Sequence, residues 1–509
     1  MRKLYYLFFV CFLACKSETN KKENSDLRRK PENPTVFITG TSDEKGFDDK
    51  ISFHDDSLFY VGKFENLKKE TLNSKLTRTL HNINSAKLLR INSFGENTFY
   101  RTAIIATPGD SVNYKLKQGK LEFFGKNEAH YNFYLEMDKD LDAWTKLYLN
   151  KYNPNFNRYK QQCDSLYNQR LTFFKNYIKQ HPTVSDNFKK IVKEDLRFEY
   201  IVNLIKPRSE IQSLWTVNTQ EDLMDIYERG DNGEGEFFDI KSYLNDISIQ
   251  EVNKPEYVKS LNFQVSLVAL LRQYFVKIRN LPYSTAALKE ELTFLKENFN
   301  PIIVNIVTAR LIKTYFDNGF GKDQKTHQFL KETIKNYKET VSDPNIIRVM
   351  EDIETELNTI NKTLPKNLKE FVLNLSKDTV SFGATLQKKN MKVIDFWASW
   401  CIPCVEEIIL SKDKRQRIAS EYNVDFLYFS IDKDTQKWID KSLDLNPFLQ
   451  DSKQYKILET KKSNLIKFLN LKSSFGIAIP RYVILDENNM ILDNNAPKPS
   501  KDNFEDFFK

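Results

Sequence analysis

Two cysteines, Cys401 and Cys404, stand three positions apart in the stretch FWASWCIPC, shortly after an apolar run that ends at Asp395. Two thiols at this spacing at the start of a helix can close a small disulfide ring. The first sulfur would lie at the helix N-terminus, where backbone N–H groups and the helix dipole favour a thiolate. The thiolate is the attacking species in thiol–disulfide exchange, and the second thiol, one turn in, resolves the mixed disulfide.

Two other interpretations of the pair are a metal site and a purely structural disulfide. Zinc normally takes four ligands, but the chain has no second C-x-x-C, and none of its five histidines lies in the C-terminal segment. The mature chain is also poor in cysteine, so it is not a scaffold stapled by disulfides. Pro403 suits the first turn of a helix, where a missing N–H costs little. The sequence favours redox chemistry, with no metal and no cofactor.

The C-terminal segment alternates strands with helices, which would position these thiols. The predicted strands are 392–397, 424–431, 481–486 and 490–492, and the predicted helices are 405–422, 435–442, 464–469 and 504–508. The last two strands form a hairpin in which Asn489 takes a left-handed conformation. This order predicts a central sheet covered by helices on both faces.

At this point the sequence resembles a known family. The stretch VIDFWASWCIPC is similar to the active-site stretch of the thioredoxin superfamily, and the resemblance extends over residues 376–509. A second element, GIAIPRYVILD (residues 476–486), supports it. The closer likeness is to membrane-anchored bacterial thiol–disulfide reductases of the TlpA/ResA type, whose motif W-C-x-P-C-x-x-E is matched by Trp400, Cys401, Pro403, Cys404 and Glu407.

The resemblance implies a role for each matching residue. Cys401 would be the nucleophile and Cys404 the resolving thiol. Pro480 would be cis, lie against the disulfide and, with the Ile479 backbone, shape the substrate groove and keep metals from the thiols. The expected substrate-binding residues around this groove are Trp400, Ile402, Pro403 and Ile479.

Asp395, six residues before Cys401, stands where the family has a buried acid that moves a proton from the second cysteine. Burial would raise its pKa toward the range useful for that task. The alternative is a strand residue at an exposed end. The sequence departs from the family at Ile409, where a proline usually kinks the helix, and the Ile402-Pro403 dipeptide differs from the Gly-Pro of thioredoxin. The dipeptide is one control on redox potential, so the direction of the reaction stays open.

The N-terminus carries the features of an export signal. Arg2-Lys3 precedes the apolar run Leu4–Leu13, and Ala14-Cys15 follows. FLAC resembles the lipobox of bacterial lipoproteins, although Phe12 replaces the more usual Leu or Val, and it implies removal of the signal and lipidation of Cys15. Acyl chains on Cys15 would anchor an exported protein to a bacterial membrane, facing the periplasm. The polar segment that follows is predicted to be a flexible tether.

The chain has 509 residues, which predicts several domains. The expected division is a signal peptide with lipobox (1–15), a tether (16–33), a β-rich domain (34–126), an α-helical region (127–370) and an α/β thioredoxin-like domain (376–509). The pairs Asn300-Pro301 and Asp343-Pro344 predict helix starts. Hydrophobic residues make up 40% of the chain, as in a soluble globular protein, and its net charge of +8 is dispersed, so no nucleic acid partner is expected.

The sequence thus predicts a thiol–disulfide oxidoreductase that reduces protein disulfides outside the cytoplasm. Its partners would be disulfide-containing proteins and a membrane electron donor of the thiol–disulfide interchange type. The alternatives are a disulfide oxidase or isomerase with a higher potential, and a binding lipoprotein whose redox domain is regulatory. Cys163, in a predicted helix, is assigned to core packing. The N-terminal regions could bind a client, dimerise or act as a spacer.

Overall fold

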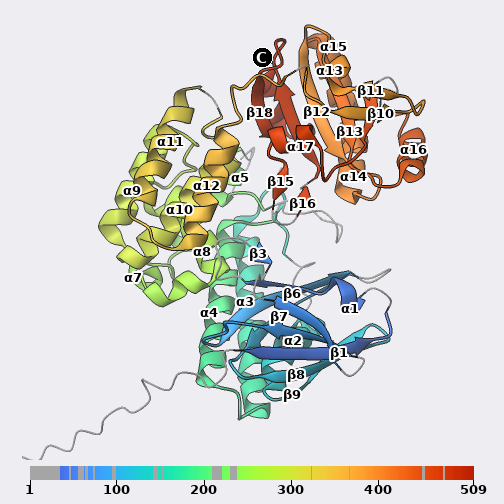
Figure 1. Cartoon of the computed structure of the whole chain (residues 1–509). Helices are drawn as coiled ribbons and strands as arrows, with labels where there is room; N and C mark the ends of the chain where they lie inside the picture. Colours follow the sequence, from blue (N-terminus) through green and yellow to red (C-terminus); the bar gives the residue numbers. More distant parts are fainter. Residues whose placement is uncertain are drawn as a thin grey trace, which may run out of the picture.

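The computed structural model describes residues 35–44, 47–55, 62–63, 67–72, 75–94, 99–141, 147–151, 153–208, 220–229, 238–322, 324–365, 367–449, 453–473, 476–477 and 479–509. In these residues the chain forms a β-rich part, a helical middle part and a C-terminal α/β domain (Figure 1). The predicted signal peptide and tether, and with them Cys15, lie outside the described residues. No helix in the described ranges is long and apolar enough to cross a membrane.

The β-rich part is a sandwich of two sheets. Its strands are β1 (Val36–Ser42), β2 (Ser52–Asp55), β3 (Gly62–Lys63), β4 (Leu67–Leu72), β5 (Lys75–Leu80), β6 (Lys87–Phe94), β7 (Phe99–Ala106), β8 (Ser111–Lys117) and β9 (Lys120–Gly125), with the short helix α1 (Phe47–Lys50). One sheet has the order β4-β5-β1-β8-β9 and the other β3-β2-β6-β7. Alternation along β8 buries Val112, Tyr114 and Leu116 in a core shared by both sheets.

The middle part is helical. Its helices are α2 (Glu128–Asp140), α3 (Phe156–Gln180), α4 (Asp186–Ile205), α5 (Leu223–Arg229), α6 (Ile240–Tyr243), α7 (Ile249–Val252), α8 (Leu261–Leu270), α9 (Thr285–Asn298), α10 (Pro301–Asp317), α11 (Gln324–Lys338) and α12 (Pro344–Leu357), with a 3-10 turn at Pro255–Lys259 and a π turn at Leu271–Phe275. The predicted starts of α10 and α12 are confirmed. Asn300 accepts a hydrogen bond from Ile302 N, and Asp343 accepts one from Asn345 N. The first helix of this middle part, α2, buries Tyr131 in the core of the β-sandwich.

The C-terminal domain is built on a seven-stranded sheet of the order β11-β10-β14-β13-β12-β17-β18. Its strands are β10 (Phe371–Asn374), β11 (Thr379–Ser381), β12 (Met391–Trp397), β13 (Val424–Ser430), β14 (Gln454–Ile457), β17 (Arg481–Leu485) and β18 (Ile491–Ala496), and its helices are α13 (Phe382–Thr385), α14 (Ile402–Leu410), α15 (Lys412–Glu421), α16 (Thr435–Asp444) and α17 (Asn464–Phe468). A two-stranded ribbon, β15 (Lys472–Ser473) and β16 (Gly476–Ile477), and a 3-10 helix, Asp502–Phe507, complete it.

Burial and pairing in this sheet confirm the predicted α/β architecture. β12, β13 and β14 run parallel, and β17 pairs antiparallel with β12. Every residue of β13 is buried, as expected for a central strand covered on both faces. Asn489 lies in the β17–β18 turn with φ 65°, in the predicted left-handed conformation.

Several predicted elements differ from the structure. The predicted helix 405–422 is two helices, α14 and α15, separated at Ser411, whose Oγ donates to Glu407 O at 2.6 Å. A hydroxyl that bonds the preceding turn in this way bends a helix even though Ile409 is not a proline. The sheet begins at β10, before the predicted start at residue 376, and the terminal helix is a 3-10 helix. The hairpin β4–β5 was not predicted, because its lysines and threonines obscure the alternation of apolar residues.

Candidate active site

The two cysteines lie where β12 ends and α14 begins. Cys401 is the N-cap residue of α14, and the structure joins it to Cys404 in a disulfide with the Cα atoms 5.3 Å apart. Cys404 N donates to Cys401 O at 3.0 Å, and Pro403 occupies the first turn. Both cysteines are almost fully buried, with exposed fractions of 5% and 1%. Cys401 therefore lies at a helix N-terminus, where the helix dipole favours the thiolate form of its reduced side chain.

The loop before Cys401 is held by a carboxylate that the sequence did not single out. Asp432, just after β13, accepts hydrogen bonds from Ser399 N at 2.8 Å and Ser399 Oγ at 2.7 Å. Ser430 Oγ donates to the same carboxylate at 2.7 Å. Because β12 and β13 are parallel, their carboxyl ends meet at one edge of the sheet. The sequence feature that could have revealed this contact is an acidic residue, Asp432, directly after the second buried strand of the predicted sheet.

Asp395 lies inside the domain, so the alternative of an exposed strand end is wrong. Its exposed fraction is 2%, and its strand neighbours are Tyr428 of β13 and Tyr482 of β17. Burial raises the pKa of Asp395 to about 7; the Arg415 guanidinium opposes this rise and the Glu407 carboxylate adds to it. A carboxyl group with a pKa near neutrality can accept and return a proton at physiological pH.

Glu407 is a second buried carboxyl group, and its place in the sequence predicted no role for it. It lies three residues after Cys404 on the buried face of α14 and is 4% exposed. Its Oε1 accepts a hydrogen bond from Ser500 N and its Oε2 one from Ser500 Oγ, both at 2.8 Å. The signal for this group was present in the sequence, because Glu407 ends the W-C-x-P-C-x-x-E motif.

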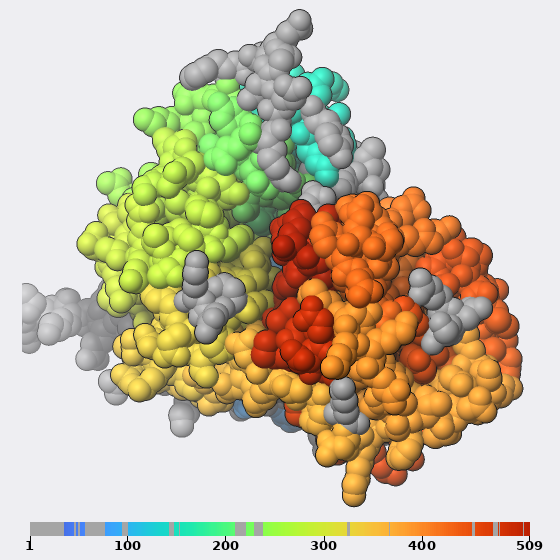
Figure 2. Space-filling model, turned by 90° about the horizontal axis from the view of Figure 1, so that it is seen from above, coloured from blue at the N-terminus to red at the C-terminus, as the bar shows by residue number. Residues whose placement is uncertain are grey.

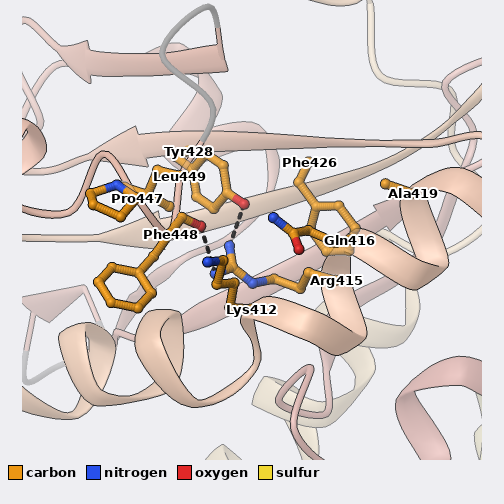
Figure 3. A pocket seen from close by; sticks show the side chains of 9 residues that line it. All are labelled: Lys412, Arg415, Gln416, Ala419, Phe426, Tyr428, Pro447, Phe448 and Leu449. Atoms are coloured by element: carbon orange, nitrogen blue, oxygen red, sulfur yellow. Dashed lines mark hydrogen bonds between the residues drawn. The ribbon is translucent and has the colours of Figure 1, made fainter.

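Arg415 of α15 supplies the positive charge near these acids. Its guanidinium donates to Tyr428 OH and to Phe448 O at 3.1 Å (Figure 3). It also donates to Ile408 O at 2.5 Å, and the side chain is buried. A pocket lies beside it, and its lining residues are Lys412, Arg415, Gln416, Ala419, Phe426, Tyr428, Pro447, Phe448 and Leu449. None of these belongs to the C-x-x-C stretch, so the pocket is separate from the disulfide.

Pro480 directly precedes β17, the strand next to β12. The Ile479–Pro480 peptide bond is cis, and the register Phe396↔Arg481 places Pro480 beside the end of β12, from which the chain leads to Cys401. Ile479 and Pro480 are half-buried. The structure therefore brings the predicted groove residues to the end of the sheet that carries the disulfide.

The two tryptophans of the stretch differ in exposure. Trp397 is fully buried and packs in the domain core, whereas Trp400 is 63% exposed. Ile402, directly after Cys401, is 49% exposed, and Pro403 is half-buried. Exposed apolar side chains thus flank Cys401, as suits contact with another polypeptide.

Cys163 lies in the helical part and not in the domain that carries the Cys401–Cys404 disulfide. It is a free thiol in α3, it is 2% exposed and it packs in the core of the helical part. Burial raises its pKa to about 12. A thiol with so high a pKa is not reactive at neutral pH, so the assignment to core packing is confirmed.

A C-x-x-C disulfide at the N-terminus of the helix that follows a central strand, beside a cis-proline, defines a thioredoxin-like oxidoreductase domain. The Redoxin family model matches residues 361–507, which cover this domain. A comparison with curated proteins finds no match.

Solved structures similar to this chain include three from bacteria. A putative thiol–disulfide oxidoreductase from Bacteroides vulgatus is 22% identical with a TM-score of 0.23, over 29% of this chain and 88% of its own. A thioredoxin-like protein from Bacteroides caccae is 14% identical with a TM-score of 0.33, over 53% of this chain and 90% of its own. A secreted disulfide oxidoreductase of Mycobacterium tuberculosis is 17% identical with a TM-score of 0.21, over 28% of this chain and 94% of its own.

Proposed function

We propose that this protein reduces protein disulfides outside the cytoplasm, by cycling Cys401 and Cys404 between dithiol and disulfide. The observation that carries the proposal is the disulfide at the N-terminus of α14 with the buried Asp395 carboxyl group on the adjoining strand. The TlpA/ResA-type motif supports the same assignment.

In the proposed reaction the Cys401 thiolate attacks one sulfur of a substrate disulfide. The substrate S–S bond breaks, a mixed disulfide forms, and the first substrate sulfur leaves as a thiolate that takes up a proton. Cys404 then gives its proton to the Asp395 carboxylate and attacks the Cys401 sulfur. This step releases the second substrate thiol and closes the Cys401–Cys404 disulfide, so two electrons have passed to the substrate.

The oxidised enzyme must then be reduced again. A membrane dithiol donor of the thiol–disulfide interchange type would supply the two electrons, because no reducing thiol pool is maintained outside the cytoplasm. Export and lipidation of Cys15, inferred from the N-terminal sequence, would hold the enzyme near that donor. Replacing Cys15 with alanine should abolish lipidation, as measured by incorporation of a labelled fatty acid into the protein.

The test is the potential of the cysteine pair. The chain from Lys16 to Lys509 is equilibrated with graded dithiothreitol or glutathione buffers, and alkylated thiols are counted by mass. A potential near that of thioredoxin, about −270 mV, supports a reductase; one near about −120 mV indicates an oxidase or isomerase instead. A Cys401–Cys404 pair that never cycles would end the proposal.

A further inference from the structure

The helical part is joined to the C-terminal domain at the strands that follow Pro480. The segment after α12 pairs with β18: Asn361 N donates to Ile491 O at 2.9 Å, and Ile491 N donates to Lys362 O at 2.9 Å. In Figure 1 the red C-terminal strands lie beside the yellow helices, and in the space-filling view of Figure 2 the red surface borders the yellow one. The connection is thus a paired extension of the sheet and not a free linker.

Four charged side chains meet at this junction, two from each side. Glu356 of α12 and Lys322 come from the helical part, and Arg481 and Asp493 come from β17 and β18. Arg481 Nη2 lies 3.6 Å from Glu356 Oε2, and Lys322 Nζ lies 3.1 Å from Asp493 Oδ2. The side chains of Lys322 and Asp493 are 6% and 0% exposed, those of Arg481 and Glu356 11% and 23%. Each ion pair therefore joins one residue of the helical part to one of the C-terminal domain, at a junction that is largely shielded from water.

Further hydrogen bonds complete the junction. Arg481 Nε donates to Asn494 O, and the fully buried Asn494 side chain donates to Thr359 Oγ1, both at 2.5 Å. Lys322 Nζ donates to Asn495 O at 2.9 Å. Arg481 thus contacts Glu356 directly, and reaches Thr359 through Asn494.

The position of Arg481 connects this junction to the site. Arg481 directly follows the cis-proline Pro480 and pairs with Phe396 of β12, the strand that leads to the disulfide. A side chain that holds Arg481 therefore restrains the first residue of β17. The backbone of Ile479 and Pro480 is the part of the groove that this restraint reaches first.

We propose that Glu356 is a positioning residue: through Arg481 it fixes the start of β17, and with it the Ile479–Pro480 backbone, in the geometry that binds a substrate polypeptide. The inference rests on the proposed function. Its consequence is that the helical part belongs to the substrate-recognition apparatus for protein disulfides and is not a mere spacer.

The experiment compares a protein with a small substrate. Glu356→Gln, in the chain from Lys16 to Lys509, should raise KM for insulin about five-fold with kcat unchanged, because it weakens one charged contact that acts on binding. Two other quantities should not change. They are the rate at which the reduced enzyme reacts with oxidised glutathione or the oxidised enzyme with reduced glutathione, and the potential of the cysteine pair. Thr359→Val, which removes only a hydroxyl, should act in the same direction and serves if Glu356→Gln fails to fold.

The matched control is Glu351→Gln, a loss of one exposed carboxylate on the same helix. It should leave every measured value unchanged. If Glu356→Gln changed the reaction with insulin and with glutathione equally, or changed only the unfolding temperature, the Glu356–Arg481 contact would serve stability alone. Either result would overturn the inference.

A second readout separates this inference from the proposed function. Deuterium uptake of Arg481–Leu485 should be about five-fold faster in Glu356→Gln than in the parent, and unchanged in Glu351→Gln. If the parent protein reduces no disulfide, the proposed function fails, and a positioning role in that reaction fails with it. If the parent is active and uptake does not change, the positioning role alone is wrong.

Discussion

Ser500 holds both carboxylate oxygens of Glu407, with its backbone N on Oε1 and its Oγ on Oε2, each at 2.8 Å. The two residues are separated by 93 positions, and Glu407 shares the buried face of α14 with Cys404. The segment before the terminal 3-10 helix therefore fixes an acid one helical turn beyond Cys404. This contact leads to the first prediction.

Ser500→Ala removes one of these two hydrogen bonds and should lower the free energy of unfolding by about 2 kcal/mol, because the acceptor is charged. In a Glu407→Gln background the same change should cost only about 1 kcal/mol. The measurement is urea unfolding followed by tryptophan fluorescence. Ser420→Ala, at an exposed hydroxyl of α15, is the control. Equal costs in both backgrounds would show that the Ser500 bond does not depend on the charge of Glu407.

The stability contributed by Asp395 should fall as pH rises. Its pKa is about 7 in the folded protein against 3.8 for an ordinary aspartate side chain in water, so between pH 4 and 7 the folded state binds more protons than the unfolded state. Unfolding free energy is therefore lost over this window, by up to about 4 kcal/mol. Asp395→Asn should be more stable than the parent at pH 8 but not at pH 4, as measured by urea unfolding at both values.

The same substitution should change the pH profile of turnover. If the Asp395 carboxylate accepts the Cys404 proton, kcat for insulin reduction rises through an inflection near pH 7, and Asp395→Asn removes that inflection. Asp413→Asn, at an exposed position of α15, should leave the profile intact. An inflection that persists in Asp395→Asn would transfer the proton-accepting role to another group, with Glu407 the next to test.

Trp400→Ala should weaken binding of protein substrates while sparing the fold. The indole is 63% exposed beside Cys401, so its removal costs little packing, whereas a flat aromatic surface can contribute about 1–2 kcal/mol to a protein contact. We expect a KM for insulin about ten-fold higher and an unchanged potential of the cysteine pair. Leu443→Ala, at another exposed apolar residue, should leave KM unchanged. A KM in Trp400→Ala equal to that of the parent would exclude the indole from the groove.

Cys163→Ala should leave activity unchanged. The thiol is buried in the core of the helical part, and the substitution removes one sulfur atom from that core, at a cost of about 1 kcal/mol. Alkylation of the reduced parent under native conditions should label the two active-site thiols at most, and Cys163 only after unfolding. Labelling of Cys163 in the folded protein, or loss of turnover in Cys163→Ala, would contradict its assignment to packing.

Local patterns were enough to predict the chemistry. The spacing of Cys401 and Cys404, with a proline between them, depends on one turn of helix, and the caps of α10 and α12 depend on two neighbouring residues. The β4–β5 hairpin was missed because charged residues occupy both strands, and the break at Ser411 because it arises from a side-chain bond to the preceding turn and not from a proline.

What the sequence by itself determined was the candidate redox pair Cys401 and Cys404, the α/β order around it and the candidate acid Asp395. Only the tertiary structure decided which groups surround them. The contact of Ser500 with Glu407 joins residues 93 positions apart, and that of Asp432 with Ser399 joins residues 33 apart. The pair Glu356–Arg481 crosses from one part of the chain to another. Such contacts leave no periodicity in the sequence, because folding brings the partners together only after the sheet and helices have set their positions.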